Sequence, residues 1–137
     1  MTIAELNNLL IEIAKTNYLV NEAFSGDVYN IDFKENKFGC FVATPMTAVR
    51  GENGTITYNY TLYYIDRLTK AEDNIDLVQT DAMNVLKGIL DRLEYHTIEV
   101  NPDFQFTVFK HQFDDWCAGA YVGVGNSLIA AAPRLLI

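Results

Sequence analysis

The segment from residue 55 to residue 93 constrains the fold more than any other part of the chain. Its first part, Thr55–Ile65, alternates between two sets of side chains, because successive residues of a β-strand face opposite sides. Its second part, Ile75–Leu93, predicts an amphipathic helix. The apolar stripe of this helix contains Ile75, Val78, Ala82, Val85, Leu86, Ile89 and Leu93. Such a strand buries one face beneath such a helix, which predicts a helix-on-sheet architecture.

Two local features of this helix allow alternatives. Either Asp73 or Asn74 is expected to cap its start. Gly88 lies in the helix interior, where glycine costs about 1 kcal/mol relative to alanine. It indicates either simple tolerance, which we favour, or the close approach of another backbone.

A first helix is predicted at the N-terminus. Thr2 and Glu5 form a capping-box pattern, and an apolar stripe from Ile3 to Ala14 follows them. We expect this helix to end near Asn17, before a loop at Asn21–Gly26.

Two short strands are expected next, at Val28–Phe33 and Lys37–Thr44, joined by a polar turn into a hairpin. Pro45 is expected to end the second strand, because proline has no N–H for a ladder. The next predicted strand is about eleven residues long, against a usual ~5–6. We therefore interpret Thr44–Thr57 as a hairpin arm that reaches beyond the body of the domain.

After His96 the apolar residues again recur at every second position, and a final strand is predicted at Ala118–Val124. An apolar tail, Leu128–Ile137, follows it. The sequence thus predicts one α+β domain over residues 1–137, with element order α-β-β-β-α-β-β. We expect an antiparallel or mixed sheet of about five strands, with two helices packed on one face.

The composition of the chain argues against several classes of function. The 137 residues carry 10 basic and 18 acidic side chains, a formal charge of −8, so we expect neither direct nucleic-acid recognition nor binding to anionic membranes. No apolar run approaches the ~18 residues of a membrane span, and no signal peptide is expected. Cys40 and Cys117 are expected to be reduced thiols.

No metal site or cofactor is expected. Cys40, His96, His111 and Cys117 contain no short-spaced pair of the kind that zinc sites use. Three glycines near the last strand, Gly119, Gly123 and Gly125, resemble a phosphate loop only superficially, because no helix follows them. We expect them to allow close packing or a bulge.

The catalytic inventory also predicts a protein that is not an enzyme. Neither Ser25 nor Ser127 lies in a nucleophile elbow, and the pair Asp114–Asp115 is typical of a solvated turn. The remaining enzymatic hypothesis, ranked last, uses Cys117 with His111 as a nucleophile pair.

Aromatic and apolar residues give the remaining functional signal. Tyrosines on the long strand, including Tyr58, Tyr60 and Tyr63, could form an interface or line a ligand pocket beneath the helices. A sheet core with hydroxyls at its wet edge explains them slightly better. Leu135, Leu136 and Ile137 are expected to contact another chain, because three apolar anchors recover only part of the entropy that ordering the tail costs.

The chain resembles the tail-terminator and tail-completion proteins, which form rings at the head–tail junction of tailed bacteriophages. The resemblance rests on the element order, the acidic balance and the long hairpin. It also rests on the segments Asn74–Gln79 with Leu86–Leu93, and Phe113–Gly119. It implies a homo-oligomeric ring in the virion neck or tail, assembled in the host cytoplasm and contacting other neck and tail proteins. The alternative is a ferredoxin-like module that binds a small molecule or a protein.

Overall fold

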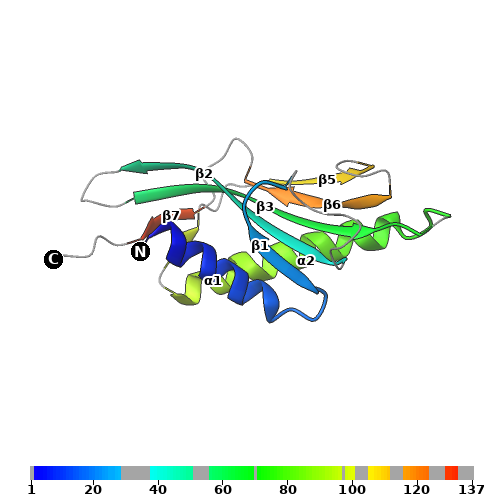
Figure 1. Cartoon of the computed structure of the whole chain (residues 1–137), viewed down its shortest axis with the longest axis horizontal. Coiled ribbons are helices and arrows are strands. Elements are labelled where there is room, and N and C mark those ends of the chain that lie inside the picture. Colours follow the sequence, from blue (N-terminus) through cyan, green and yellow to red (C-terminus); the bar gives the residue numbers. More distant parts are fainter. Residues whose placement is uncertain are drawn as a thin grey trace.

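The computed structural model describes residues 2–28, 38–50, 56–69, 71–96, 98–100, 105–111, 116–123 and 129–132. Runs of consecutive strands separated by helices follow one another along the chain, which is typical of the α+β class (Figure 1). Along the chain the elements are α1 (Ile3–Lys15), β1 (Glu22–Ser25), β2 (Cys40–Arg50), β3 (Ile56–Arg67), α2 (Ile75–Leu93), the 3₁₀ helix η3 (Glu94–His96), β4 (Glu99–Val100), β5 (Phe106–Lys110), β6 (Cys117–Val122) and β7 (Ile129–Ala132).

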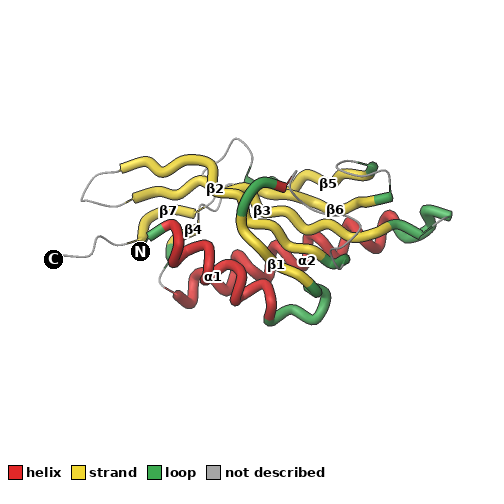
Figure 2. The backbone as a smooth tube through the Cα atoms, viewed as in Figure 1, coloured by secondary structure: helices red, strands yellow, loops and turns green. Residues whose placement is uncertain are grey.

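The described strands form one mixed sheet. Five of them follow the order β1-β2-β3-β6-β5, in which β1 and β2 are parallel and the other neighbours antiparallel. The short strands β7 and β4 add to this path, because β7 pairs with β3 and also with β4. Both α-helices lie on one side of the sheet (Figure 2). The predicted α+β class, with about five main strands and two helices on one face, is confirmed.

The main core lies between the helices and the sheet. The strand β3 turns Tyr58, Tyr60, Leu62 and Tyr64 toward this side, where all four are buried. Residues of both helices pack against them, among them Leu6, Leu10, Ile13, Leu86, Ile89 and Leu93. The predicted alternation of the strand and the predicted stripes of both helices therefore meet in one core.

A smaller apolar cluster lies on the opposite face of the sheet. It contains Val28, Cys40, Val42, Ile65, Phe109 and Cys117, all buried. Gly119 lies among these strands, opposite both Ile65 and Phe109 in the register. A Cβ atom there would lie 1.9 Å from the Tyr64 carbonyl oxygen, so only glycine fits. The interpretation of this glycine as a close-packing residue is confirmed.

The helix boundaries follow the local signals. Thr2 caps α1, its hydroxyl accepting from the Glu5 N–H at 3.1 Å, so the predicted capping box is present. The predicted bounds of α2 match the structure. Asn74 occupies the cap position of α2 without a side-chain capping bond, because its amide instead joins the preceding turn, accepting from the Thr69 N–H and donating to the Arg67 carbonyl.

Two predictions for the first third of the sheet are wrong. Residues 22–25, expected in a loop, form β1, because the parallel partner Cys40–Ala43 supplies main-chain hydrogen bonds that no local pattern reveals.

Pro45 does not end β2. The Ala43 carbonyl accepts from the Gly26 N–H on the β1 side, so the nitrogen of Pro45, two residues on, faces the same open edge and needs no ladder partner. The strand continues past a register shift between Pro45 and Thr47. The predicted strand Val28–Phe33 falls almost entirely outside the described residues.

The C-terminal tail is partly ordered by its own domain, contrary to the prediction. Within it, Ile129–Ala132 forms β7, which pairs Ala132 with Ile56 and Ile129 with Tyr58 of β3. The prediction considered main-chain pairing of the tail only with a neighbouring subunit, whereas the long strand β3 offers main-chain partners within the same chain. Leu135, Leu136 and Ile137 lie outside the described residues.

Candidate functional site

The nucleophile pair proposed from Cys117 and His111 does not form a reactive arrangement. The Cys117 side chain is fully buried in the cluster opposite the helices. The main-chain N–H of His111 donates to the Cys117 carbonyl at 2.7 Å, but its imidazole pairs with the Glu72 carboxylate, 2.5 Å away. The two residues are thus neighbours through their backbones and face different partners with their side chains.

The two cysteines are held apart by the sheet. Cys40 lies on β2 and Cys117 on β6, and β3 runs between them. Strands two positions apart are separated by about 9.5 Å. A disulfide needs Cα atoms within about 7 Å, so these thiols cannot pair without moving the strands. Burial, with smaller contributions from Glu22 and Cys117, raises the pKa of Cys40 to about 12, so this thiol stays protonated at neutral pH.

No group of metal-ligating side chains converges among the residues that the structure describes. Asp114, Asp115 and Gly125 lie outside them. Gly123 has a φ of +104°, and a Cβ there would lie 2.0 Å from the Tyr60 carbonyl oxygen, so it too is a close-packing position.

Of the tyrosines predicted at an interface, two belong to the core. The exposed fractions of Tyr58 and Tyr60 are 5% and 1%. The Tyr60 hydroxyl donates to Asn7 Oδ1 of α1, and burial, followed by the charge of Tyr58, raises the pKa of Tyr60 to about 12. The Tyr64 hydroxyl donates to the Leu19 carbonyl at 3.1 Å, and burial also raises its pKa. This matches the alternative of a sheet core with hydroxyls at its edge.

Tyr63 alone of the three faces the side of the sheet opposite the helices. Its ring lies 5.7 Å from that of Tyr121, which in turn stacks on Phe109. At the same face the Arg67 guanidinium lies 4.1 Å above the centre of the Phe38 ring. Half-buried aromatic rings and arginine are residue types that interfaces favour, so Tyr63 keeps its place in the interface hypothesis.

The far end of the β2–β3 hairpin is the most exposed apolar part of the sheet. We call its described residues, Met46–Arg50 of β2 and Ile56–Thr57 of β3, the arm. Met46 and Val49 expose 61% and 53% of their area, and Ile56 also exposes its side chain. The pairing of β1 with β2 ends at Ala43, so the outer edge of β2 has no strand beside it in the arm among the described residues. In Figure 1 the hairpin extends past the ends of β5 and β6.

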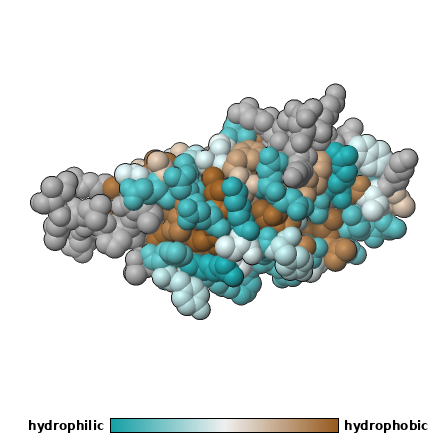
Figure 3. All heavy atoms as spheres, turned by 60° about the horizontal axis from the view of Figure 1, so that its bottom comes forward, coloured by the Kyte–Doolittle hydropathy of each residue, from teal (hydrophilic) through white to brown (hydrophobic). Residues whose placement is uncertain are grey.

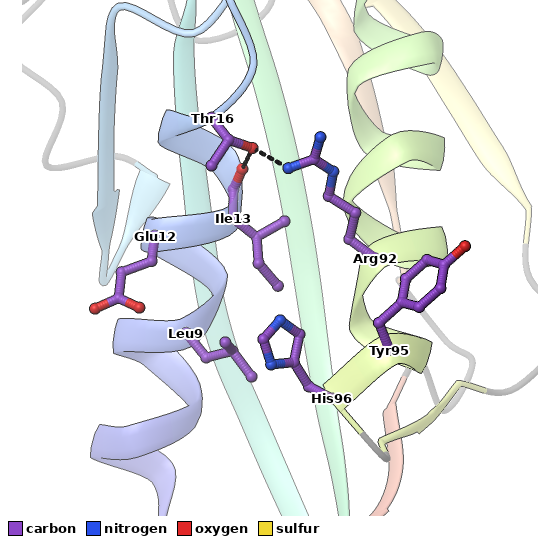
Figure 4. A pocket seen from close by; sticks show the side chains of 7 residues that line it. All are labelled: Leu9, Glu12, Ile13, Thr16, Arg92, Tyr95 and His96. Atoms are coloured by element: carbon purple, nitrogen blue, oxygen red, sulfur yellow. Dashed lines mark hydrogen bonds between the residues drawn. The ribbon is translucent and has the colours of Figure 1, made fainter.

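A groove lies between the two helices. Its volume is about 400 Å³, and it is lined by Leu9, Glu12, Ile13, Thr16, Arg92, Tyr95 and His96. Leu9 and Ile13 supply apolar surface from α1 (Figure 4). A second hollow of about 170 Å³, next to Gly88, shares Ile13, Thr16 and Arg92 with the groove. Figure 3 shows apolar surface between polar stretches on the side of the molecule that carries the helices.

A hydrogen-bonded link crosses this groove. The Thr16 hydroxyl donates to the Ile13 carbonyl at 2.6 Å and accepts from Arg92 Nη1 at 2.5 Å. The pocket predicted beneath the helices is not found where it was expected, because the tyrosine-bearing face of β3 is packed against helix side chains. The cavity instead lies between the helices, on side chains that the sequence pattern did not single out.

No protein-family profile matches the chain, and no curated protein is significantly similar to it in sequence. Within the described residues, neither helix combines the length and the apolar character needed to cross a bilayer.

Proposed function

We propose that this protein is a non-enzymatic structural subunit that assembles into a ring in the neck or tail of a tailed bacteriophage. The observation that carries the proposal is the arm, in which Met46 and Val49 are mostly exposed along a stretch of β2 whose outer edge has no strand beside it among the described residues. An apolar projection of this kind is unfavourable in an isolated subunit and favourable when a neighbour covers it.

The sheet edges support assembly through main-chain pairing. The arm leaves the outer edge of β2 open, and β5 ends the five-strand path on the other side. Near this second edge Val108 is exposed. Joining one edge to the opposite edge of the next copy is a heterologous contact, which closes into a ring when the rotation between copies divides a full turn. Main-chain hydrogen bonds would supply affinity, and Met46, Val49 and Val108 would supply apolar area.

The phage assignment rests on the resemblance of the sequence to tail-terminator and tail-completion proteins. The α+β order and the long hairpin that carry this resemblance are both present. The expected partners are further copies of this chain and other neck or tail proteins, which places the protein in the virion. The net charge of −8 agrees with a role without nucleic-acid recognition.

The test is the mass of the full chain under native conditions, alone and with virion components. The arm variant Met46→Ser/Val49→Ser/Ile56→Ser removes apolar area from the arm and leaves the core intact. A matched control, Leu77→Ser/Tyr18→Ser, removes exposed apolar area elsewhere. We expect the wild type and the control to form a closed oligomer, and the arm variant to remain a folded monomer.

A wild-type chain that stays monomeric at every concentration and never associates with phage particles would refute the proposal. An arm variant that assembles as well as the wild type would show that the arm is not the contact.

The groove between α1 and α2 favours a second candidate, a module that binds a small molecule. Its volume of about 400 Å³ lies within the range typical of ligand pockets.

A further inference from the structure

The groove between α1 and α2 has an apolar floor with a few polar groups above it. Leu9 is half-buried and Ile13 almost fully buried, so both are held in place by the core beneath them. A floor fixed in this way is preformed, and a ligand that covers it gains hydrophobic free energy without reorganising the chain.

Of the groups that line the groove, Arg92 supplies a positive charge. In Figure 4 the His96 imidazole lies between the two helices, and the Arg92 side chain extends toward Thr16. The Glu12 carboxylate and the Tyr95 hydroxyl point away from the space between the helices. The interior of the groove is therefore cationic or neutral, although the chain as a whole carries a charge of −8.

Arg92 is held in a position suited to an anion. One N–H of its guanidinium donates to the Thr16 hydroxyl, whose own hydrogen is committed to the Ile13 carbonyl. A guanidinium has five donors, and the described residues give that of Arg92 no second hydrogen-bond acceptor. The remaining donors can bind an oxyanion, and the bond to Thr16 reduces the side-chain entropy that binding must remove.

We propose that this groove binds a small amphipathic monocarboxylate, with its carboxylate on the Arg92 guanidinium and its apolar part on Leu9 and Ile13. A cationic ligand is disfavoured because its charge would meet Arg92. A doubly charged phosphate is disfavoured relative to a carboxylate because the groove adjoins the negative C-terminal end of the α2 dipole, which repels two charges more strongly than one. A single carboxylate matches the planar fork of one guanidinium.

Binding at this groove would be independent of assembly through the arm. The groove is formed by α1, α2 and η3, and none of its lining residues belongs to the hairpin. The ligand would connect the two helices, with its carboxylate on Arg92 of α2 and its apolar part on Leu9 and Ile13 of α1, in addition to the bond between Arg92 and Thr16. Octanoate should therefore raise the unfolding temperature, since a ligand that binds the folded state stabilises it.

The experiment titrates the full ¹⁵N-labelled chain with octanoate and follows the amide signals by NMR. Octan-1-ol and octylamine, which have the same alkyl chain, test the need for the carboxylate. The variant Arg92→Met removes the guanidinium and keeps an apolar stem. Lys87→Met is the matched control, since it removes a positive charge from the exposed side of the same helix without touching the groove.

We expect saturable shifts at Leu9, Ile13, Thr16 and Arg92 with octanoate, and binding weaker by about tenfold or more in Arg92→Met, the loss typical of a charged hydrogen bond. Octanol and octylamine should also bind about tenfold more weakly, and Lys87→Met should bind octanoate like the wild type. A thermal melt of each variant confirms that it folds.

Three results would overturn the proposal: no saturable shifts at millimolar octanoate, shifts centred away from the groove, or equal octanoate affinity in the wild type and Arg92→Met. If Arg92→Met did not fold, Arg92→Gln would replace it, and undiminished octanoate binding by that variant would refute the role of the guanidinium equally.

Discussion

The two halves of the β2–β3 hairpin belong to one hydrogen-bonded ladder but differ in the burial of their side chains and in the strands beside them. In the half near the helices, Phe41 and Leu62 are fully buried, and both strands have a further strand beside them, β1 or β6. In the arm, Met46 and Val49 are mostly exposed, and the outer edge of β2 is open among the described residues. The sequence is rich in β-branched and aromatic residues in both halves, so strand propensity alone does not separate them.

The difference shows that strand pairing and side-chain burial depend on different neighbouring elements. A hairpin needs only its own two strands for the ladder, and local contacts such as the bond from Asn59 Nδ2 to Thr47 Oγ1 support it. Burial needs a second layer, and the helices cover the inward face of β3 as far as Tyr58, whereas Met46 and Val49 of β2 remain exposed. The arm is therefore folded but contributes little to the core, and its apolar residues remain available for contact with another chain.

The largest expected effect compares one residue from each half. Leu62→Ala should lower the free energy of unfolding by about 2–5 kcal/mol, because it opens a cavity in the packed core. Val49→Ala should change the free energy of unfolding by less than about 0.5 kcal/mol, because the Val49 side chain is mostly exposed and its truncation removes little buried area. Urea unfolding of both variants at a concentration where the chain is monomeric measures the two values. Similar losses would show that the arm belongs to the core.

The second prediction uses pH. Burial raises the pKa of Tyr60 from 10.0 to about 12 and that of Cys40 from 9.0 to about 12. Both groups keep their proton longer in the folded chain, so their contribution to stability is complete below about pH 9 and is lost as the pH rises toward 12. Tyr60→Phe should flatten the decline between pH 10 and 12, and Val49→Ala should leave it unchanged. Urea unfolding across pH 8–12 tests this, and a steeper decline in Tyr60→Phe would contradict the assignment.

The smallest expected effect concerns helix α2, which packs on one face of the sheet. Gly88 lies inside α2, and a Cβ added there would have no atom of another residue within 4 Å, which supports simple tolerance over close backbone approach. Gly88→Ala should therefore stabilise the chain by about 0.5–1 kcal/mol through helix propensity. Thermal or urea unfolding measures the gain, while amide exchange in the arm should stay the same. A loss of stability would mean that a side chain in the hollow beside Gly88 disturbs the packing of α2 by more than the gain in helix propensity.

Local patterns in the sequence predicted much of this fold. The capping box of Thr2 and Glu5 and the apolar stripe of α2 depend on residues three or four positions apart, so both helices could be placed with accuracy. The alternation of β3 likewise predicted which tyrosines face the helices. The strands β1 and β7 were missed because each is short and is stabilised by a distant partner, Cys40–Ala43 and β3 respectively.

The candidate sites were less predictable for the same reason. Thr16 and Arg92 are 76 residues apart, and only the packing of α1 against α2 brings them together. No sequence spacing marks such a groove. Pro45 gives the opposite lesson, since the rule that proline ends a strand fails where its nitrogen faces an open edge. The interpretation of Thr44–Thr57 as a hairpin arm rested on the length of the strand, and it stays a prediction.

The central claim is that the arm serves assembly and not the fold of the single subunit. Amide hydrogen exchange measured at a dilute, monomeric concentration and again at an assembling concentration tests it most directly. We predict that residues 41–43 are protected at both concentrations, whereas those amides of residues 47–50 that face the open edge of β2 exchange rapidly when dilute and become protected on assembly. Equal and strong protection of these edge amides in the dilute monomer, or rapid exchange at both concentrations, would contradict the claim.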